Sequence, residues 1–422
     1  MTRATRIRHH LMRAAAAACA ALGTIGAIGL GLQATSATAR AEEGQRQCQA
    51  GIENYITETP WTNTLFNVEA LHEQSTGKGV TVAIIDSGVS VDNPHLVDAI
   101  VEGTSYVPDD DSHGKQDVYN HGTIVAGIIG ARRINGSSLV GIAPDAKIMP
   151  IRVFEALRQE NGQTTGGPDM FTIAEGIRYA VDHGADVINI SMSDTHDVPV
   201  VKEAVAYADD HGTLVVASAG NRLTSSSTVD GMRYPAAYPQ VVGVSAVTNE
   251  LLSTEDAIHG TQVDVVAPGA NVASTIPSGI DCAFSDGSST SYATAFVSGQ
   301  AALIAERYPD ETPAQWKQRI LATANRAHPD ERDDEYGWGV IDPIASLNVA
   351  LSDDIRGPSA EGGAARLQAD QTTERVTLVP LHDPNALAKR IVMLMTIATV
   401  VICATAWLYS LRRRDNADST QA

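Results

Sequence analysis

Basic residues are scarce in this chain of 422 residues, in which 30 Lys and Arg stand against 50 Asp and Glu, for a formal net charge of -20. Such an acidic body repels polyanions, so nucleic acid is not an expected partner. The sequence also lacks internal repeats. Its hydrophobic content of 43% is ordinary for folded proteins and excludes wholesale disorder. We therefore expect one large globular domain with appendages.

The N-terminal segment has the three parts of a secretory signal peptide. Four arginines lie near its start, an apolar run continues to Leu32, and the small residues 37–39 precede Arg40. We therefore expect residues 1–39 to be removed on export. The alternative is a retained N-terminal anchor.

A second apolar segment lies near the C-terminus. Residues 391–411 carry no formal charge and are long enough to cross a bilayer as one helix. Three arginines follow at once, and such clusters stay on the cytoplasmic side. We predict a single-pass anchor in the cell membrane, with the globular body of the chain extracellular and residues 412–422 as a cytoplasmic tail. Residues 353–388, rich in Gly, Ala, Pro and charge, are typical of a linker.

Cysteine is scarce as well, with four residues in the chain. Cys19 falls in the predicted signal peptide and Cys403 in the predicted membrane span, which leaves Cys48 and Cys282 outside. In an oxidising compartment such a pair favours one disulfide, and the alternative is two free buried thiols. A disulfide would hold the N-terminal extension, residues 40–65, close to the serine-rich loop that follows Cys282.

Short apolar runs alternate with helix-like segments between residues 66 and 352. Buried strands separated by helices indicate an α/β fold with a mostly parallel sheet and helices on both faces. The predicted strands are Val80–Ile85, Lys147–Val153, Val187–Ile190, Leu214–Ala217, Val241–Val247 and Val263–Val266. The predicted helices include Met170–His183, Val198–His211 and Thr294–Arg307.

Asp86 and His121 stand at the borders of predicted elements. Asp86 ends the first strand, where a carboxylate can orient an imidazole and stabilise its charged form. Most strand-end carboxylates, however, only cap a turn or a helix. His121 opens an apolar helix whose small residues, such as Gly122, permit close backbone approach. A histidine taken alone is more often structural.

Ser291 and Asn221 stand in comparable places. Ser291 lies at the start of an apolar helix, where free N–H groups and the helix dipole favour developing negative charge. Alternatively, this serine-rich stretch forms a flexible loop. Asn221 follows the predicted strand Leu214–Ala217, and its amide can donate to an oxyanion. The alternative for Asn221 is a turn residue that holds the backbone.

Taken in chain order, Asp86, His121, Asn221 and Ser291 resemble the pattern of the subtilisin-like serine protease family, over about residues 68–347. The resemblance implies Ser291 as nucleophile, His121 as general base and then acid, and Asp86 as its orienting partner. It also implies that Asn221 and the Ser291 backbone N–H form the oxyanion hole. We expect no cofactor and no metal.

The same resemblance implies that extended peptide segments bind along two strand ends, largely through their main chains. One edge consists of Ser191, Met192 and Ser193. The other consists of Ala217, Ser218, Ala219 and Gly220.

Two positions depart from the family pattern. Ser289 stands where glycine is usual, and Ala295 stands where proline is usual. The first change would strain or reshape the loop before Ser291, and the second removes a rigid turn constraint.

The run Asp109–Asp111 is a candidate calcium site because hard cations favour clustered carboxylates. A solvated acidic loop is the commoner outcome, and we expect no metal there.

The domain organisation resembles that of the mycosins, anchored proteases associated with type VII secretion. It consists of a signal peptide, a short cysteine-bearing extension, a protease domain (residues 66–352), a linker, a membrane span and cytoplasmic arginines. This implies an extracytoplasmic serine endopeptidase that processes exported proteins, with components of the secretion complex as partners. The alternative is a structural component that stabilises such a complex, with protease activity dispensable.

Overall fold

The computed structural model describes one folded unit at length. Contacts divide the chain into Met1–Ala365 and Arg366–Ala422. The predicted signal peptide, residues 40–54 of the extension, the tail and nearly all of the linker lie outside the described residues. The described residues are 55–155, 158–160, 163–165, 167, 169–225, 227–284, 289–328, 330–352, 355, 357–358, 394–396, 399 and 405–406.

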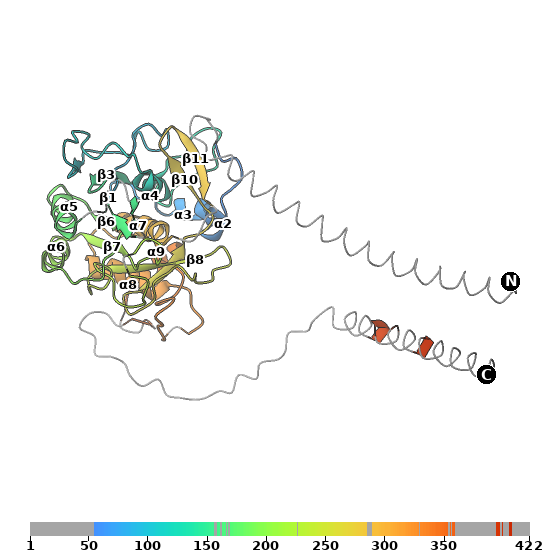
Figure 1. Ribbon diagram of the computed structural model, residues 1–422. Helices are drawn as coiled ribbons and strands as arrows, with labels where there is room; N and C mark the ends of the chain where they lie inside the picture. Colours follow the sequence, from blue (N-terminus) through green and yellow to red (C-terminus); the bar gives the residue numbers. More distant parts are fainter. Residues whose placement is uncertain are drawn as a thin grey trace, which may run out of the picture. The chain divides into compact units, whose positions relative to one another are not determined.

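A seven-stranded sheet with the order β2-β3-β1-β6-β7-β8-β9 forms the centre of the first unit (Figure 1). All its pairings are parallel, which confirms the predicted α/β fold. Each of the six predicted strands corresponds to an observed strand, with ends that agree within two residues. The strands are β1 (Thr81–Asp86), β2 (Thr104–Ser105), β3 (Lys147–Arg152), β6 (Val187–Ile190), β7 (Leu214–Ser218), β8 (Val242–Val247) and β9 (Val265–Pro268).

Helices cover both faces of this sheet, as predicted. On one face lie α5 (Met170–Asp182) and α6 (Pro199–Asp210), and on the other lie α4 (His121–Gly130) and α7 (Thr290–Arg307) (Figure 1). Two further helices, α8 (Pro313–Thr323) and α9 (Pro343–Asn348), contact α7.

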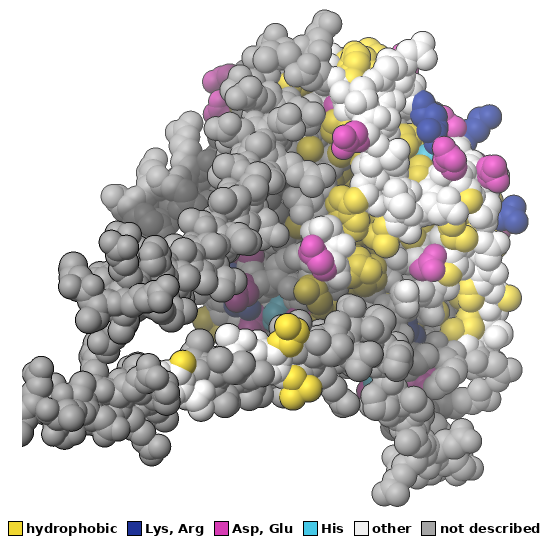
Figure 2. Space-filling view, turned by 90° about the vertical axis from the view of Figure 1, so that its right-hand side faces the viewer, with side chains coloured by type: hydrophobic (Ala, Val, Ile, Leu, Met, Phe, Trp, Pro, Cys, Tyr) yellow, Lys and Arg dark blue, Asp and Glu magenta, His cyan; other side chains and the backbone are white. Residues whose placement is uncertain are grey.

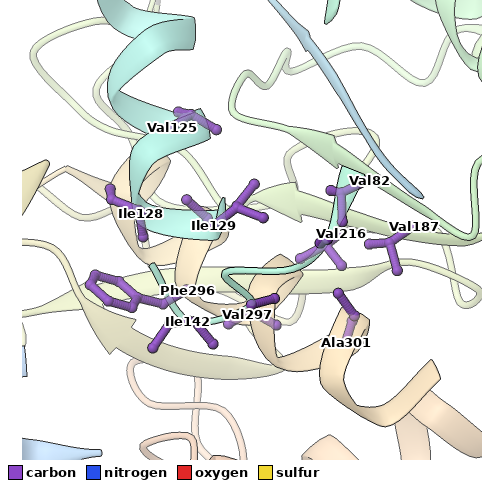
Figure 3. Close-up of a cluster of buried hydrophobic side chains, with 14 of the residues drawn as sticks. Val82, Val125, Ile128, Ile129, Ile142, Val187, Val216, Phe296, Val297 and Ala301 are labelled. Carbon is purple, nitrogen blue, oxygen red and sulfur yellow. The ribbon is translucent and has the colours of Figure 1, made fainter. Parts of the chain in front are cut away.

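The pleat of β1 shows how the sheet separates two cores. Val82 and Ile84 belong to the core beneath α4 and α7, whereas Ala83 and Ile85 belong to the core beneath α5 and α6. Successive side chains of a strand point to opposite faces, so a strand buried on both faces must be apolar throughout. Figure 3 shows the first core, where side chains of α4 and α7 meet those of the strands.

Helix α7 runs through the middle of the unit. Its side chains are buried almost continuously from Thr290 to Ala305, as expected of a helix that is covered on all sides. It begins four residues before the predicted Thr294, because its first turn is polar and the apolar pattern that predicted it starts later. This early start places Ser291 inside the first helical turn.

Smaller elements lie around this frame. They are α2 (Trp61–Leu65), α3 (Val68–His72) and the antiparallel pairs β4 (Arg158–Glu160) with β5 (Gln163–Thr165) and β10 (Val272–Ile276) with β11 (Ile280–Phe284). The described end of the predicted extension packs on the rest of this unit. The Ile56 N–H donates to Asp281 Oδ2 at 2.9 Å, and Trp61 Nε1 donates to the Asn271 carbonyl at 2.9 Å.

The predicted membrane span falls largely outside the described residues. Residues 394–396, 399 and 405–406 of it are described, and all are helical. Within the described part of the chain, no helix is both long and apolar enough to cross a bilayer. The span therefore stays a prediction.

Acidic side chains are spread over the face in Figure 2, and basic ones are fewer among the described side chains visible there. Of the Asp109–Asp111 run, Asp110 pairs with the buried Arg152 at 2.8 Å, and the Asp110 side chain is 9% exposed. Burial opposes the charged carboxylate, but hydrogen bonds from Ser105 and Ser112 and the Arg152 charge lower the pKa of Asp110 to about 2. Asp110 therefore stabilises a buried arginine, whereas Asp109 and Asp111 are exposed, as expected of a solvated loop. No group of metal-ligating side chains occurs among the described residues.

Candidate active site

Asp86 is fully buried at the carboxyl end of β1. Its Oδ1 accepts the Ser87 N–H at 2.7 Å, and both carboxylate oxygens contact Nδ1 of His121, at 2.8 and 2.9 Å. A carboxylate is tolerated in the interior only with such donors. The end of β1 thus fixes a negative charge against one nitrogen of the histidine ring.

His121 is the first residue of α4, and a close backbone contact sets its position. A Cβ on Gly122 would lie 2.0 Å from the carbonyl oxygen of Gly88 and 3.2 Å from Cβ of Asp86. The chain turns at Gly88 with a φ of +101°, which favours glycine. Glycine at both positions therefore lets α4 start directly against the end of β1, as the small residues of this helix predicted.

Asp117 was not predicted as a site residue, yet it organises the start of α4. Its Oδ1 accepts the N–H groups of Tyr119 and Asn120 and the Ser87 hydroxyl, at 2.8 to 3.0 Å. Its Oδ2 accepts the N–H of Thr123 at 2.9 Å and the hydroxyl of the same residue at 2.6 Å. A cap is normally sought at the residue just before a helix. Here Asn120 adopts a left-handed conformation with a φ of 72°, and the capping carboxylate is that of Asp117, which lies earlier in the chain than the residue just before the helix.

The charges around His121 favour its protonated form. Burial alone would lower its pKa, but the charge and hydrogen bonds of Asp86, with a smaller contribution from Asp117, raise the pKa above the usual value of 6.5. The His121 side chain is 21% exposed. Because Nδ1 donates to Asp86, the neutral ring carries its free lone pair on Nε2, the atom that a general base uses.

Ser291 lies in the first turn of α7, with 5% of its surface exposed. In this structure its hydroxyl donates to the backbone carbonyl of Ser191 at 3.1 Å, and the Ser191 hydroxyl donates to the carbonyl of Ser291 at 3.3 Å. Among the described residues, Ser291 Oγ makes this bond and none to His121. The next residue, Tyr292, has its ring centroid 6.3 Å from that of His121, so the two helix starts are neighbours.

Asn221 links the end of β7 to the start of α7. Its Oδ1 accepts the Thr290 N–H at 3.0 Å, and this contact directs Nδ2 away from Thr290. Next to it, the hydroxyls of Ser218 and Thr290 are 2.5 Å apart. The amide therefore holds the backbone, as one interpretation of the sequence expected. Its Nδ2 makes no hydrogen bond to a described residue.

The two predicted substrate edges leave neighbouring parallel strands, since Ile190 pairs with Ala217. Met192 packs against the core beneath α5 and α6, whereas Ser191 contacts Ser291 as described above. Ala217 and Ala219 are fully buried, backbone included, and Ser218 is 2% exposed, so in this structure the second edge presents little surface to a peptide.

The structure shows what the two departures from the family pattern do. Ser289 has a φ of -120° and a ψ of 120°, which any residue adopts without strain, and its hydroxyl accepts the Ser291 N–H at 3.2 Å. The expected strain is therefore absent. Ala295 is fully buried inside α7, which continues through it without interruption.

Cys282 lies on β11 and is 1% exposed. Its predicted partner, Cys48, lies outside the described residues, so the disulfide stays a prediction.

Comparisons with known proteins agree with this geometry. The model of the subtilase family matches residues 77–339. Subtilisin E of Bacillus subtilis (strain 168) is 35% identical over 271 residues, which are 64% of this chain and 67% of that protein. Among solved structures, MycP1 from Mycobacterium smegmatis has a TM-score of 0.63 and 26% identity, covering 76% of this chain and 93% of that one. The MycP3 protease from the type VII (ESX-3) secretion system has a TM-score of 0.59 and 27% identity, covering 71% of this chain and 93% of that one. These neighbours confirm the predicted resemblance to the mycosins. The chain therefore belongs to the subtilase family and is a subtilisin-like serine protease.

Proposed function

We propose that Asp86, His121 and Ser291 are the catalytic triad of an extracytoplasmic serine endopeptidase anchored in the cell membrane by residues 391–411. The observation that carries this proposal is the contact of both Asp86 oxygens with Nδ1 of His121. It fixes the tautomer and orientation that a general base needs. The start of α4 and the start of α7, with its serine, lie side by side.

Acylation begins when the Ser291 hydroxyl leaves the Ser191 carbonyl and turns toward Nε2 of His121. Ser291 Oγ then adds to the carbonyl carbon of the peptide bond, and its proton passes to Nε2. The buried Asp86 carboxylate stabilises the imidazolium that forms. The developing oxyanion accepts hydrogen bonds from Asn221 Nδ2 and from the Ser291 N–H.

Collapse of this intermediate breaks the C–N bond. His121 gives its proton to the leaving amine, and the acyl group stays on Ser291 Oγ. Water then attacks the ester carbon and gives a proton to His121. The bond from the acyl carbon to Ser291 Oγ breaks, His121 returns the proton to Oγ, and the carboxylate product leaves. No metal or other cofactor takes part in these steps.

The substrates in this proposal are extended segments of exported proteins, paired by their main chains with the edges at Ser191–Ser193 and Ala217–Gly220. The likeness to MycP1 and to MycP3, a protease of a type VII secretion system, supports a place in such a system. The predicted signal peptide and membrane span support a catalytic domain outside the cell. We include in this proposal a disulfide between Cys48 and Cys282.

A second candidate function is a structural role in the secretion complex, with proteolysis dispensable. The observation that favours it is the resting position of the Ser291 hydroxyl, which is bonded to Ser191 and not to His121.

The two candidate functions can be distinguished by comparing cells that carry Ser291→Ala with cells that lack the whole chain. If proteolysis is the function, Ser291→Ala abolishes the processing of exported proteins as completely as the deletion. If the role is structural, Ser291→Ala keeps secretion and the deletion abolishes it. The matched control is Ser138→Ala, a serine substitution away from the site.

A further inference from the structure

We propose that Ser289 restrains the protease by covering one of its two oxyanion donors. This inference rests on the proposed catalytic role of Ser291. The observation behind it is the hydrogen bond from the Ser291 N–H to Oγ of Ser289, at 3.2 Å.

The N–H groups in the first turn of α7 already have partners within the protein. Thr290 donates to Asn221 Oδ1 at 3.0 Å, and Tyr292 and Ala293 donate to the Ser289 carbonyl at 3.2 and 3.3 Å. The remaining donor, on Ser291, is the one that would stabilise an oxyanion on the attacked carbonyl. It is the donor that the Ser289 hydroxyl occupies.

Ser289 can release this donor without a movement of the main chain. Its own N–H donates to the carbonyl of Gly269 at 3.0 Å, and its carbonyl holds the first turn of α7 as described above. The residue is therefore fixed at both ends, and rotation about χ1 alone moves the hydroxyl. Ser289 is partly exposed, so the rotated hydroxyl can bond to water.

The hydrogen bond to the Ser291 N–H depends on the Ser289 side chain, because the backbone at this position is one that other residues also adopt. With a φ of -120°, position 289 accepts alanine or glycine without strain. Neither residue has a hydroxyl to offer to the Ser291 N–H. A substrate carbonyl then meets a donor that is already free, whereas in the native chain it must first displace Ser289 Oγ. Ser289 is thus a positioning residue that sets how readily the oxyanion site opens.

The test measures the second-order rate of phosphonylation of Ser291 in the purified full chain by a fluorophosphonate probe. Ser289→Ala and Ser289→Gly should each react about threefold to tenfold faster than the native protein, the range that one neutral hydrogen bond supports. With a peptide substrate, kcat should rise while KM stays nearly constant, because the freed donor acts mainly on the transition state. Ser289→Thr keeps a capping hydroxyl and should react at the native rate.

A matched control separates this effect from the simple loss of a helix cap. The Thr312 hydroxyl also caps a helix, since it accepts the Gln315 N–H at 3.3 Å at the start of α8, and α8 carries no proposed site residue. Thr312→Ala and Ser289→Ala should both lower the melting temperature, and only Ser289→Ala should change the rate.

An unchanged or slower rate of phosphonylation in folded Ser289→Ala would overturn the inference. A slower rate would mean that the Ser289 hydroxyl donates a hydrogen bond to the oxyanion. If the native protein is nevertheless labelled at Ser291, the proposed function is still supported and only the role of Ser289 is wrong. If neither the native protein nor Ser289→Ala is labelled although both are folded, the proposed function itself fails.

Discussion

Replacing Asp86 by asparagine removes a buried negative charge while it keeps the size of the side chain. The native carboxylate has both oxygens within 2.9 Å of His121 Nδ1 and is fully buried. Asparagine presents an N–H₂ group to the same ring. The imidazolium of the transition state loses its counter-charge, and the neutral ring is driven toward the tautomer that has its proton on Nε2.

The size of the loss follows from the contact. Two unit charges about 4 Å apart interact by about 4 kcal/mol at the effective dielectric of about 20 that suits protein sites. This energy corresponds to about three orders of magnitude in rate. The wrong tautomer adds to the loss, so we expect kcat of Asp86→Asn to fall about 10⁴-fold, with KM much less affected.

The pH profile provides an independent readout of the same contact. Activity needs a neutral His121, whose pKa is raised above 6.5 by Asp86 against the effect of burial. The acid limb of kcat/KM should therefore lie above pH 6.5 in the native protein. In Asp86→Asn the effect of burial prevails, and the limb should move to lower pH. An activity loss smaller than about tenfold, or an acid limb that does not move, would refute the reasoning.

Stability should show the opposite dependence on pH. A pKa that is higher in the folded state than in the unfolded state means that folding favours protonated His121. This contribution to the free energy of unfolding is complete below pH 6.5 and is lost as the pH rises through the folded-state pKa. The stability difference between native protein and Asp86→Asn, measured by urea unfolding, should therefore shrink as the pH rises through this range.

Three further substitutions test other parts of the site and fold. Asn221→Asp keeps the acceptor for the backbone but removes the Nδ2 donor, so kcat should fall about 10² to 10³-fold at nearly constant melting temperature. Asp281→Asn weakens a buried contact with His95 at 3.0 Å, and the urea midpoint should reveal a loss of about 3 kcal/mol; an unchanged midpoint would contradict this. Gly220→Ala places a Cβ 3.0 Å from Ser193 Oγ at a φ of +104°, so calorimetry should show a loss of about 2 kcal/mol, and native stability would count against the strain.

The sequence predicted the frame of the fold because buried parallel strands leave an unambiguous pattern. The apolar run at Val187–Ile190 coincides with β6 residue for residue. Such runs are short, continuous and bounded by polar residues, so their ends could be predicted closely. The hairpin of β10 and β11 was missed, since Ser274 and Thr275 give β10 no apolar run although both are buried.

Asp86 and His121 stand at element borders, as predicted, whereas the apolar pattern placed the start of α7 at Thr294 and did not show that Ser291 lies inside its first turn. What the sequence did not indicate are the contacts that depend on the folded backbone. Asp117 reaches the start of α4 because Asn120 is in a left-handed conformation, which no local rule for caps anticipates. The resting bond of Ser291 to Ser191 joins residues 100 positions apart and depends on the packing of α7 against β6.

The most direct test of the account is to locate the adduct after the purified full-length protein reacts with a fluorophosphonate. Mass spectrometry of the digested protein should place the adduct on Ser291. The labelling should disappear in His121→Ala. The control variant His183→Ala, which changes an exposed histidine on the far side of the sheet, should be labelled normally. Labelling at another residue, or no labelling of a protein shown to be folded, would contradict the proposed triad.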